Sequence, residues 1–422
     1  MNRFGLSRKR FALLFSVMLV AAAGNTAMQS LLPGIGRALG IADIWVAVAL
    51  SLSGVLWVVT APIWAHRADR RGRRALMRLG LYGFIGSMLV CGSVLAVGLA
   101  GLFAPMTVFV VFILGRTIYG AFGSASPPAV QAYVAARTDG EQRTNALAAI
   151  ASSFALGTII GPAIAPLFIV GPLGLSAPLF VFAGIGVAVL IALVLWLPDD
   201  TPRNPARGAI VSYPSLGTDA PVLVAEGEPA RLRWRDPRVL PWHAVGLISG
   251  HGQAAMLGVM GFLIIDRLAL PPQHAQQWFA IVLVSGALAS LLTQLWLIPQ
   301  LGLAPRQLVA WGALVAALGT AIIGLSISVY GITMGFSLAS LGFGLIRPGF
   351  TSGASLAVAP HEQNAVAGMV TSVNGFAYIA APAIGVALYG IAIPLPFFAV
   401  AATLAGLAVW TALRVKSSAR AA

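Results

Sequence analysis

Three ionisable side chains lie inside long apolar stretches of this sequence: Arg116, His251 and Arg347. A charge in such surroundings is costly and by default marks a functional position. Arginine binds carboxylate or phosphate groups through a planar fork of donors, and histidine exchanges a proton near neutral pH. Each of these three residues also has an alternative role. Arg116 could be structural, Arg347 could be an anchor that reaches the membrane interface, and His251 could be a packed residue bonded to a carbonyl.

Four neutral polar side chains lie in similar surroundings: Asn25, Gln29, Gln253 and Asn374. Asn25 and Gln29 are one helical turn apart, so a helix places them on the same face. Such amides bind a ligand or form hydrogen bonds between helices, and both interpretations stay open. We predict that these four residues form a binding site together with the three ionisable ones. His251 and Arg116 are the candidates for carrying a proton.

The twelve acidic residues all fall outside the apolar stretches, with Asp43 and Asp266 at the ends of two of them. A cavity with two arginines, a histidine and no buried acid has a positive potential. This potential favours a small anionic or zwitterionic molecule carrying carboxylate or phosphate groups.

Motifs of enzymes and cofactor sites are missing from the sequence. It holds neither a glycine-rich phosphate loop with lysine nor an HExxH helix. Its single cysteine, Cys91, excludes an intrachain disulfide and a cysteine metal cluster. We therefore expect no enzymatic activity, no cofactor and no metal.

Only 9% of the chain is charged and 59% is hydrophobic, whereas a soluble protein carries roughly 25% charged residues. The lipid bilayer is therefore the expected solvent, and apolar runs of about 20 residues predict transmembrane helices. A basic segment precedes the first run as in a signal peptide, but this run continues to about Pro33, so we predict a helix that stays in the membrane. Twelve spans are predicted, at residues 11–32, 44–65, 77–98, 106–127, 145–167, 177–197, 244–265, 276–297, 307–327, 329–350, 365–387 and 393–413.

The basic residues give this arrangement an orientation. If the N-terminus is cytoplasmic, 22 of the 26 Lys and Arg residues lie on the inner side, while Arg37 and Arg267 lie on the outer side. This asymmetry follows the positive-inside rule and predicts a cytoplasmic N-terminus and C-terminus. The net charge of +14 therefore indicates membrane orientation and not a nucleic-acid partner.

The chain is expected to consist of two halves, residues 1–197 and 244–422, joined by a polar cytoplasmic linker at residues 198–243. The connections before the fifth and eleventh spans both contain Glu-Gln, at Glu141 and Glu362. The recurrence of this Glu-Gln pair about half a chain length apart indicates a six-plus-six duplication.

The stretch "AHRADRRGRR" at residues 65–74 contains five arginines around one aspartate and one glycine. It resembles the signature between helices 2 and 3 of the major facilitator superfamily, with Ala65 in place of the first glycine. The resemblance implies an all-α integral membrane protein with twelve helices in two pseudo-symmetric halves. It also implies a gate, in which Asp69 would meet the start of helix 11 and an arginine near the end of helix 4, here Arg137. The gating candidates are Asp69, Arg70, Gly72, Arg73, Arg74 and Arg137.

Two further stretches resemble this family. "LGRTIYGAFG" contains Arg116 but has Tyr119 where Gln is usual, and "GTIIGPAIAP" matches the antiporter signature at Gly157, Gly161 and Pro162. Packing of small residues between helices is the competing interpretation. The resemblance implies a monomeric secondary transporter of the bacterial inner membrane, which exports small organic molecules by proton antiport and alternating access. Its alternatives are an anion uptake symporter or exchanger, and a receptor or scaffold without transport.

Overall fold

Long helices make up the structure, a computed structural model that describes residues 7–138, 140–198, 214, 216, 232–359 and 362–414. The chain divides into two units, Met1–Glu226 and Gly227–Ala422. Within the described residues, twelve helical stretches are long and apolar enough to cross a membrane, which confirms the predicted number. A helix satisfies its backbone polar groups internally, as lipid requires.

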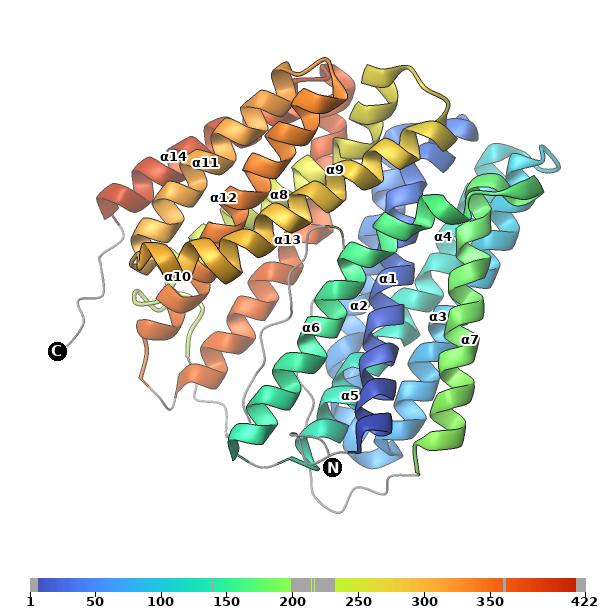
Figure 1. Ribbon diagram of the computed structural model, residues 1–422, viewed down its shortest axis with the longest axis horizontal. Helices are drawn as coiled ribbons and strands as arrows, with labels where there is room; N and C mark the ends of the chain where they lie inside the picture. Colours follow the sequence, from blue (N-terminus) through green and yellow to red (C-terminus); the bar gives the residue numbers. More distant parts are fainter. Residues whose placement is uncertain are drawn as a thin grey trace. The chain divides into compact units, whose positions relative to one another are not determined.

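The first unit contains seven α-helices in six spans (Figure 1). They are α1 (Arg8–Ala38), α2 (Asp43–Arg71), α3 (Arg73–Leu99), α4 (Pro105–Phe122), α5 (Ser126–Ala135), α6 (Gly140–Ile164) and α7 (Ala177–Trp196). Short 3-10 turns lie at Gly123–Ala125, Ala165–Phe168 and Gly171–Ser176.

The second unit repeats this plan, again with six spans. Its helices are α8 (Leu240–Leu268), α9 (Pro272–Leu292), α10 (Ile298–Leu301), α11 (Pro305–Leu325), α12 (Val329–Leu356), α13 (Gln363–Ile391) and α14 (Leu395–Arg414). A π-helical segment, Thr293–Leu297, joins α9 to α10 within one span.

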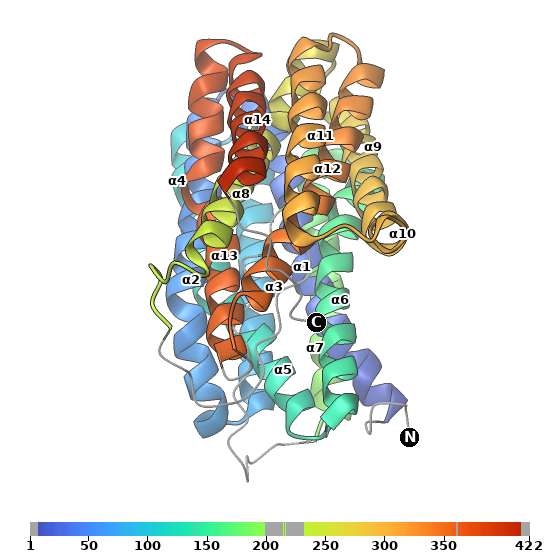
Figure 2. The same ribbon diagram turned by 90° about the vertical axis from the view of Figure 1, so that its left-hand side faces the viewer.

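Helix pairing supports the internal duplication. In the first unit α1 packs on α6, α2 on α4, and α3 on both α4 and α7. In the second unit α8 packs on α13, α9 on α12, and α11 on both α12 and α14 (Figures 1 and 2). Each pair occupies the same place in the order of spans, so the two units share one topology.

The fourth span runs further than the sequence predicts. The prediction ends near residue 127, whereas helical structure continues through a 3-10 turn into α5 and ends at Ala135. Pro127 and Pro128 follow the turn at the start of α5, where proline's missing N–H costs no hydrogen bond. The prolines therefore restart the helix instead of ending it.

Candidate functional site

A hollow in the second unit brings together three of the predicted binding residues. It is lined by Ser249 and Gln253 from α8, Phe343 and Arg347 from α12, and Asn374 and Tyr378 from α13. The positions on α8 and α13 are each four residues apart, so one face of each helix points into the hollow. The lining contains one positive charge and several neutral hydrogen-bonding groups, and the hollow has a volume of about 20 Å³, enough for about one water molecule.

Arg347 is the charged group of this hollow. It is half-buried and lies nine residues before the end of α12, so it is not at the helix terminus. Among the residues that line the hollow there is no carboxylate. The ionic charge that lines the hollow is therefore positive.

His251 lies on α8 between these lining positions, but it is not among the residues that line the hollow. Its Nδ1 is 2.7 Å from the carbonyl oxygen of Leu247, so Nδ1 is the donor and Nε2 is the acceptor of the neutral ring. The ring lies 6.2 Å from that of Phe376 on α13. His251 is half-buried, and access to Nε2 decides whether it can exchange a proton.

The first unit contains a separate polar group around Arg116. Its side chain is 0% exposed, and Nη2 donates to Oδ1 of Asn25 over 2.8 Å. The guanidinium carbon lies 5.4 Å from the ring centroid of Tyr119. Arg116 therefore binds an amide oxygen of its own unit.

Asn25 and Gln29 lie together, as the one-turn spacing predicts, and both are buried. Both side-chain amides donate to the carbonyl oxygen of Pro214, Gln29 over 2.8 Å. The Leu216 N–H donates to Oε1 of Gln29 over 3.2 Å. Residues of the predicted linker therefore contact the polar face of α1.

Sequence reasoning did not select Tyr119 and Tyr378 as site residues. The Tyr119 hydroxyl donates to the Ala21 carbonyl oxygen over 3.1 Å and connects α4 to α1. Tyr378 could have been found from its spacing, since it lies one helical turn after Asn374. Tyr389 was also missed: its hydroxyl donates to Asp266 over 2.7 Å, near the end of α8.

Gly157 and Gly161 allow α6 to approach α1 closely. A Cβ at Gly161 would lie 2.0 Å from the Ala23 carbonyl oxygen, and one at Gly157 would lie 2.4 Å from that of Leu19. Pro162 follows inside the same helix. These contacts provide the packing role that was the competing interpretation of the antiporter signature.

The loop between α2 and α3 contains most of the gating candidates. Gly72 has φ 84°, a backbone conformation that favours glycine. Arg73 is buried, and Nη2 of Arg74 donates to the Val194 carbonyl oxygen of α7. Arg137 lies over the ring of Tyr133 at 3.7 Å. The side chains of Asp69 and Arg70 lie outside the described residues, so the gate itself stays a prediction.

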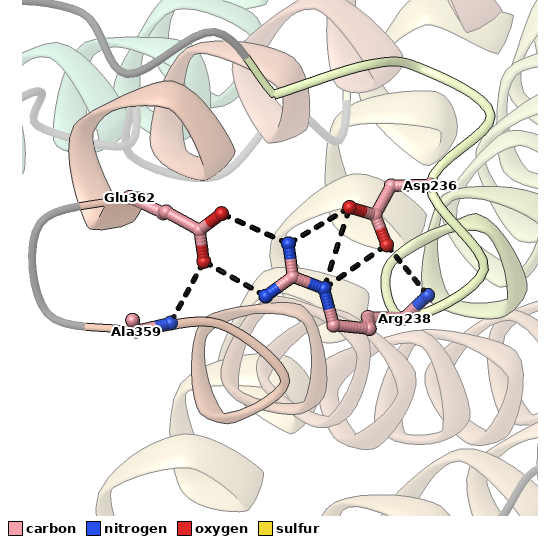
Figure 3. Close-up of polar contacts among 4 residues, drawn as sticks. All are labelled: Asp236, Arg238, Ala359 and Glu362. Carbon is pink, nitrogen blue, oxygen red and sulfur yellow. Dashed lines mark hydrogen bonds and ion pairs between the residues drawn. The ribbon is translucent and has the colours of Figure 1, made fainter.

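A second polar cluster connects the segment before α8 to the segment before α13 (Figure 3). Arg238 donates to both carboxylate oxygens of Glu362, over 2.9 and 2.8 Å, and also to Asp236. Glu362 accepts a further bond from the Ala359 N–H over 3.0 Å. Hydrogen bonds from the Arg238 side chain and backbone lower the pKa of Asp236. We call Asp236, Arg238 and Glu362 the α8–α13 clip.

Metal ligands do not gather in the part of the chain that the structure describes: no three His, Cys, Asp or Glu residues lie together there.

A family model described as "Major Facilitator Superfamily" matches residues 13–382. The chain belongs to the major facilitator superfamily. The twelve candidate membrane spans of the described residues fit this family.

Two named relatives are similar to parts of this chain. "Multidrug resistance protein 2" of Bacillus subtilis is 26% identical over 45% of this chain and 44% of its own length. A "multi-drug resistance efflux pump PmrA homolog" of Lactococcus lactis is 26% identical over 42% of this chain and 40% of its own length. The matched stretches thus span less than half of these relatives.

The fold is similar to solved transporter structures over nearly the whole chain. A bacterial homologue of the human lysosomal transporter Spinster gives a TM-score of 0.69 at 13% identity, covering 96% of both chains. The human organic anion transporter MFSD10 gives 0.63 at 18% identity, covering 96% of this chain and 100% of its own. At these identities the likeness shows the fold alone.

Proposed function

We propose that this protein exports small anionic or zwitterionic organic molecules across the bacterial inner membrane in exchange for protons, as a monomer that alternates between two open states. The observation that carries the charge preference is the hollow of the second unit. There Arg347 lies among Gln253, Asn374 and Tyr378, and no carboxylate lines the hollow. Arg347 presents a planar fork of donors, which suits a carboxylate or phosphate group of a substrate.

Direction and coupling rest on other grounds. The partial likeness to multidrug efflux proteins favours export. Coupling to protons is assigned to His251, because histidine titrates near neutral pH and every acid of the sequence falls outside the predicted spans. Asp69 and its neighbours would form the gate on the cytoplasmic side.

Matched pairs of ligands test the charge preference. Purified protein is screened by thermal shift against carboxylic acids and their uncharged amides, in the wild type and in Arg347→Gln. We expect acids to stabilise the wild type more than amides do, and Arg347→Gln to lose this difference. Arg347→Lys is the control, since it retains the charge but loses the planar fork. A lipophilic cation bound equally well by the wild type and Arg347→Gln would contradict the proposal.

Transport in proteoliposomes with an imposed pH gradient tests the coupling. A substrate found by the screen should move against its own gradient when protons flow the other way. Co-transport with protons in the same direction would instead support the uptake symporter. His251→Gln should flatten the pH dependence of transport. An unchanged pH profile would remove His251 from the coupling path.

A further inference from the structure

The polar face of α1 binds a segment of the chain's own backbone. Asn25 and Gln29 belong to α1, whereas Pro214 and Leu216 follow in the sequence more than 180 residues later. All four residues belong to the first unit. The contact therefore joins a transmembrane helix to the predicted linker within one unit.

The three hydrogen bonds recognise a particular chemical pattern. Two amide N–H groups, one from Asn25 and one from Gln29, converge on the carbonyl oxygen of Pro214. The oxygen of the Gln29 side chain accepts the Leu216 N–H. Gln29 thus donates to the carbonyl of one peptide group and accepts from the N–H of the next, which is the pattern of two consecutive secondary amides.

Burial makes this arrangement selective. Asn25 is 0% and Gln29 4% exposed, and side-chain amides buried to this extent need hydrogen-bond partners. Arg116 holds Oδ1 of Asn25 over 2.8 Å and thereby turns the Asn25 N–H groups toward Pro214. The orientation of the Asn25 amide is therefore fixed from within the transmembrane helices.

We propose that Asn25 and Gln29 form a subsite for two consecutive peptide groups, that Pro214 and Leu216 occupy it as an internal ligand, and that transported molecules carry such a pair of amides, able to displace them. This inference rests on the proposed transport function, because it names a chemical class of substrate. A tethered ligand competes at an effective concentration of about a millimolar, so substrate must be abundant or bind more strongly.

A peptide supplied in trans tests the subsite. The probe is the acetylated and amidated peptide of residues 211–217, labelled for a binding measurement on the purified full chain. Leu216→Pro removes the backbone N–H that Gln29 accepts, whereas Leu216→Ala retains it and is the matched control. We expect the peptide to bind Leu216→Pro about five- to tenfold more tightly than it binds Leu216→Ala or the wild type, because the internal competitor is weakened.

Two further variants make the result specific. Gln29→Leu in the Leu216→Pro background should abolish peptide binding, and a peptide N-methylated at the leucine should bind about five- to tenfold more weakly. Replacing residues 209–219 by a Gly-Ser segment of equal length removes the competitor without a proline, and should match Leu216→Pro. Equal peptide binding by Leu216→Pro and Leu216→Ala, or retained binding in the Gln29→Leu variant, would overturn the inference.

Binding is measured without transport, which separates the two proposals. Peptide binding without a proton-driven flux would support the proposed subsite and contradict the proposed antiport. A proton-driven flux of molecules without an amide, together with no peptide binding, would support the proposed antiport and contradict the proposed subsite.

Discussion

Arg116 shows how a single charge is accommodated in the interior of the first unit. The side chain is fully buried, donates to Asn25 and lies against Tyr119. Such a hydrogen bond to a charged group is worth about 1.5–3 kcal/mol, and losing its acceptor is costly. Asn25 is thus a support for the arginine as well as a candidate ligand group.

We expect Asn25→Ala to lower the free energy of unfolding by about 1.5–3 kcal/mol, because Arg116 loses the Asn25 acceptor. Asn25→Asp is the control, since it retains an oxygen for Arg116 and removes the donor to Pro214. Thermal unfolding in detergent measures both. The Asn25→Ala protein, which loses both bonds, should melt further below the wild type than Asn25→Asp, which loses only the bond to Pro214. Equal melting of Asn25→Ala and the wild type would show that Arg116 does not depend on Asn25.

At the scale of the helices, α6 packs closely against α1 at Gly161. The Cβ that an alanine would add at Gly161 meets the Ala23 carbonyl oxygen at 2.0 Å and the Thr26 hydroxyl oxygen at 2.7 Å. Neither neighbour can move without displacing α1, since the first is backbone. This pair of helices therefore depends on a small residue at this position.

Gly161→Ala should destabilise the protein by about 1–3 kcal/mol, the usual cost of overpacking. Gly184→Ala in α7 is the matched control, because a Cβ there meets nothing within 4 Å. Alanine is the better helix former by about 0.5–1 kcal/mol, so the control should be neutral or slightly stabilised. Thermal unfolding of the two variants measures this difference in stability. Equal melting temperatures would refute the packing argument.

The α8–α13 clip is sensitive to acid through Asp236. Its pKa is lowered in the folded state, chiefly by the hydrogen bond from the Arg238 side chain. The unfolded carboxyl has a pKa of about 3.9. The stabilisation is therefore complete above about pH 4 and is lost as the pH falls through the lower folded pKa.

Arg238→Gln should melt at a lower temperature than the wild type at pH 6, and the difference should shrink as the pH falls below about 4. The neighbouring Arg235→Gln is the control, because Arg235 is exposed and no hydrogen bond joins it to a described residue. Melting curves recorded from pH 6 to about pH 3 test this. A constant difference across that range would show that Asp236 does not contribute.

At the scale of the molecule, orientation in the membrane follows from charge. The loops that contain most of the arginines alternate with loops that contain almost none. Basic residues resist transfer across the membrane, so we expect the arginine-rich loops to stay in the cytoplasm.

Reporter fusions after residues 102, 172 and 328 should report the periplasm, and fusions after residues 140, 220 and 361 should report the cytoplasm. Residue 102 lies between α3 and α4, and residue 328 directly precedes α12. A reporter that fluoresces only in the cytoplasm, paired with one active only in the periplasm, provides the readout. One inverted fusion would contradict the orientation.

The number of spans, the duplication and the family could all be read from the sequence, because apolar length and helical spacing are local properties. Local spacing also explains why Asn25 and Gln29 share a face, and why Gly157 and Gly161 do. Only the tertiary structure decided which partners these faces meet. Arg347 and Tyr378 line the same hollow. Arg116 donates to Asn25, and the buried Gln29 amide donates to the carbonyl oxygen of Pro214. Such contacts join residues far apart in the sequence, and the pairing of whole helices fixes them. The period of a single helix predicts which side chains share a face, but it does not predict which element packs against that face.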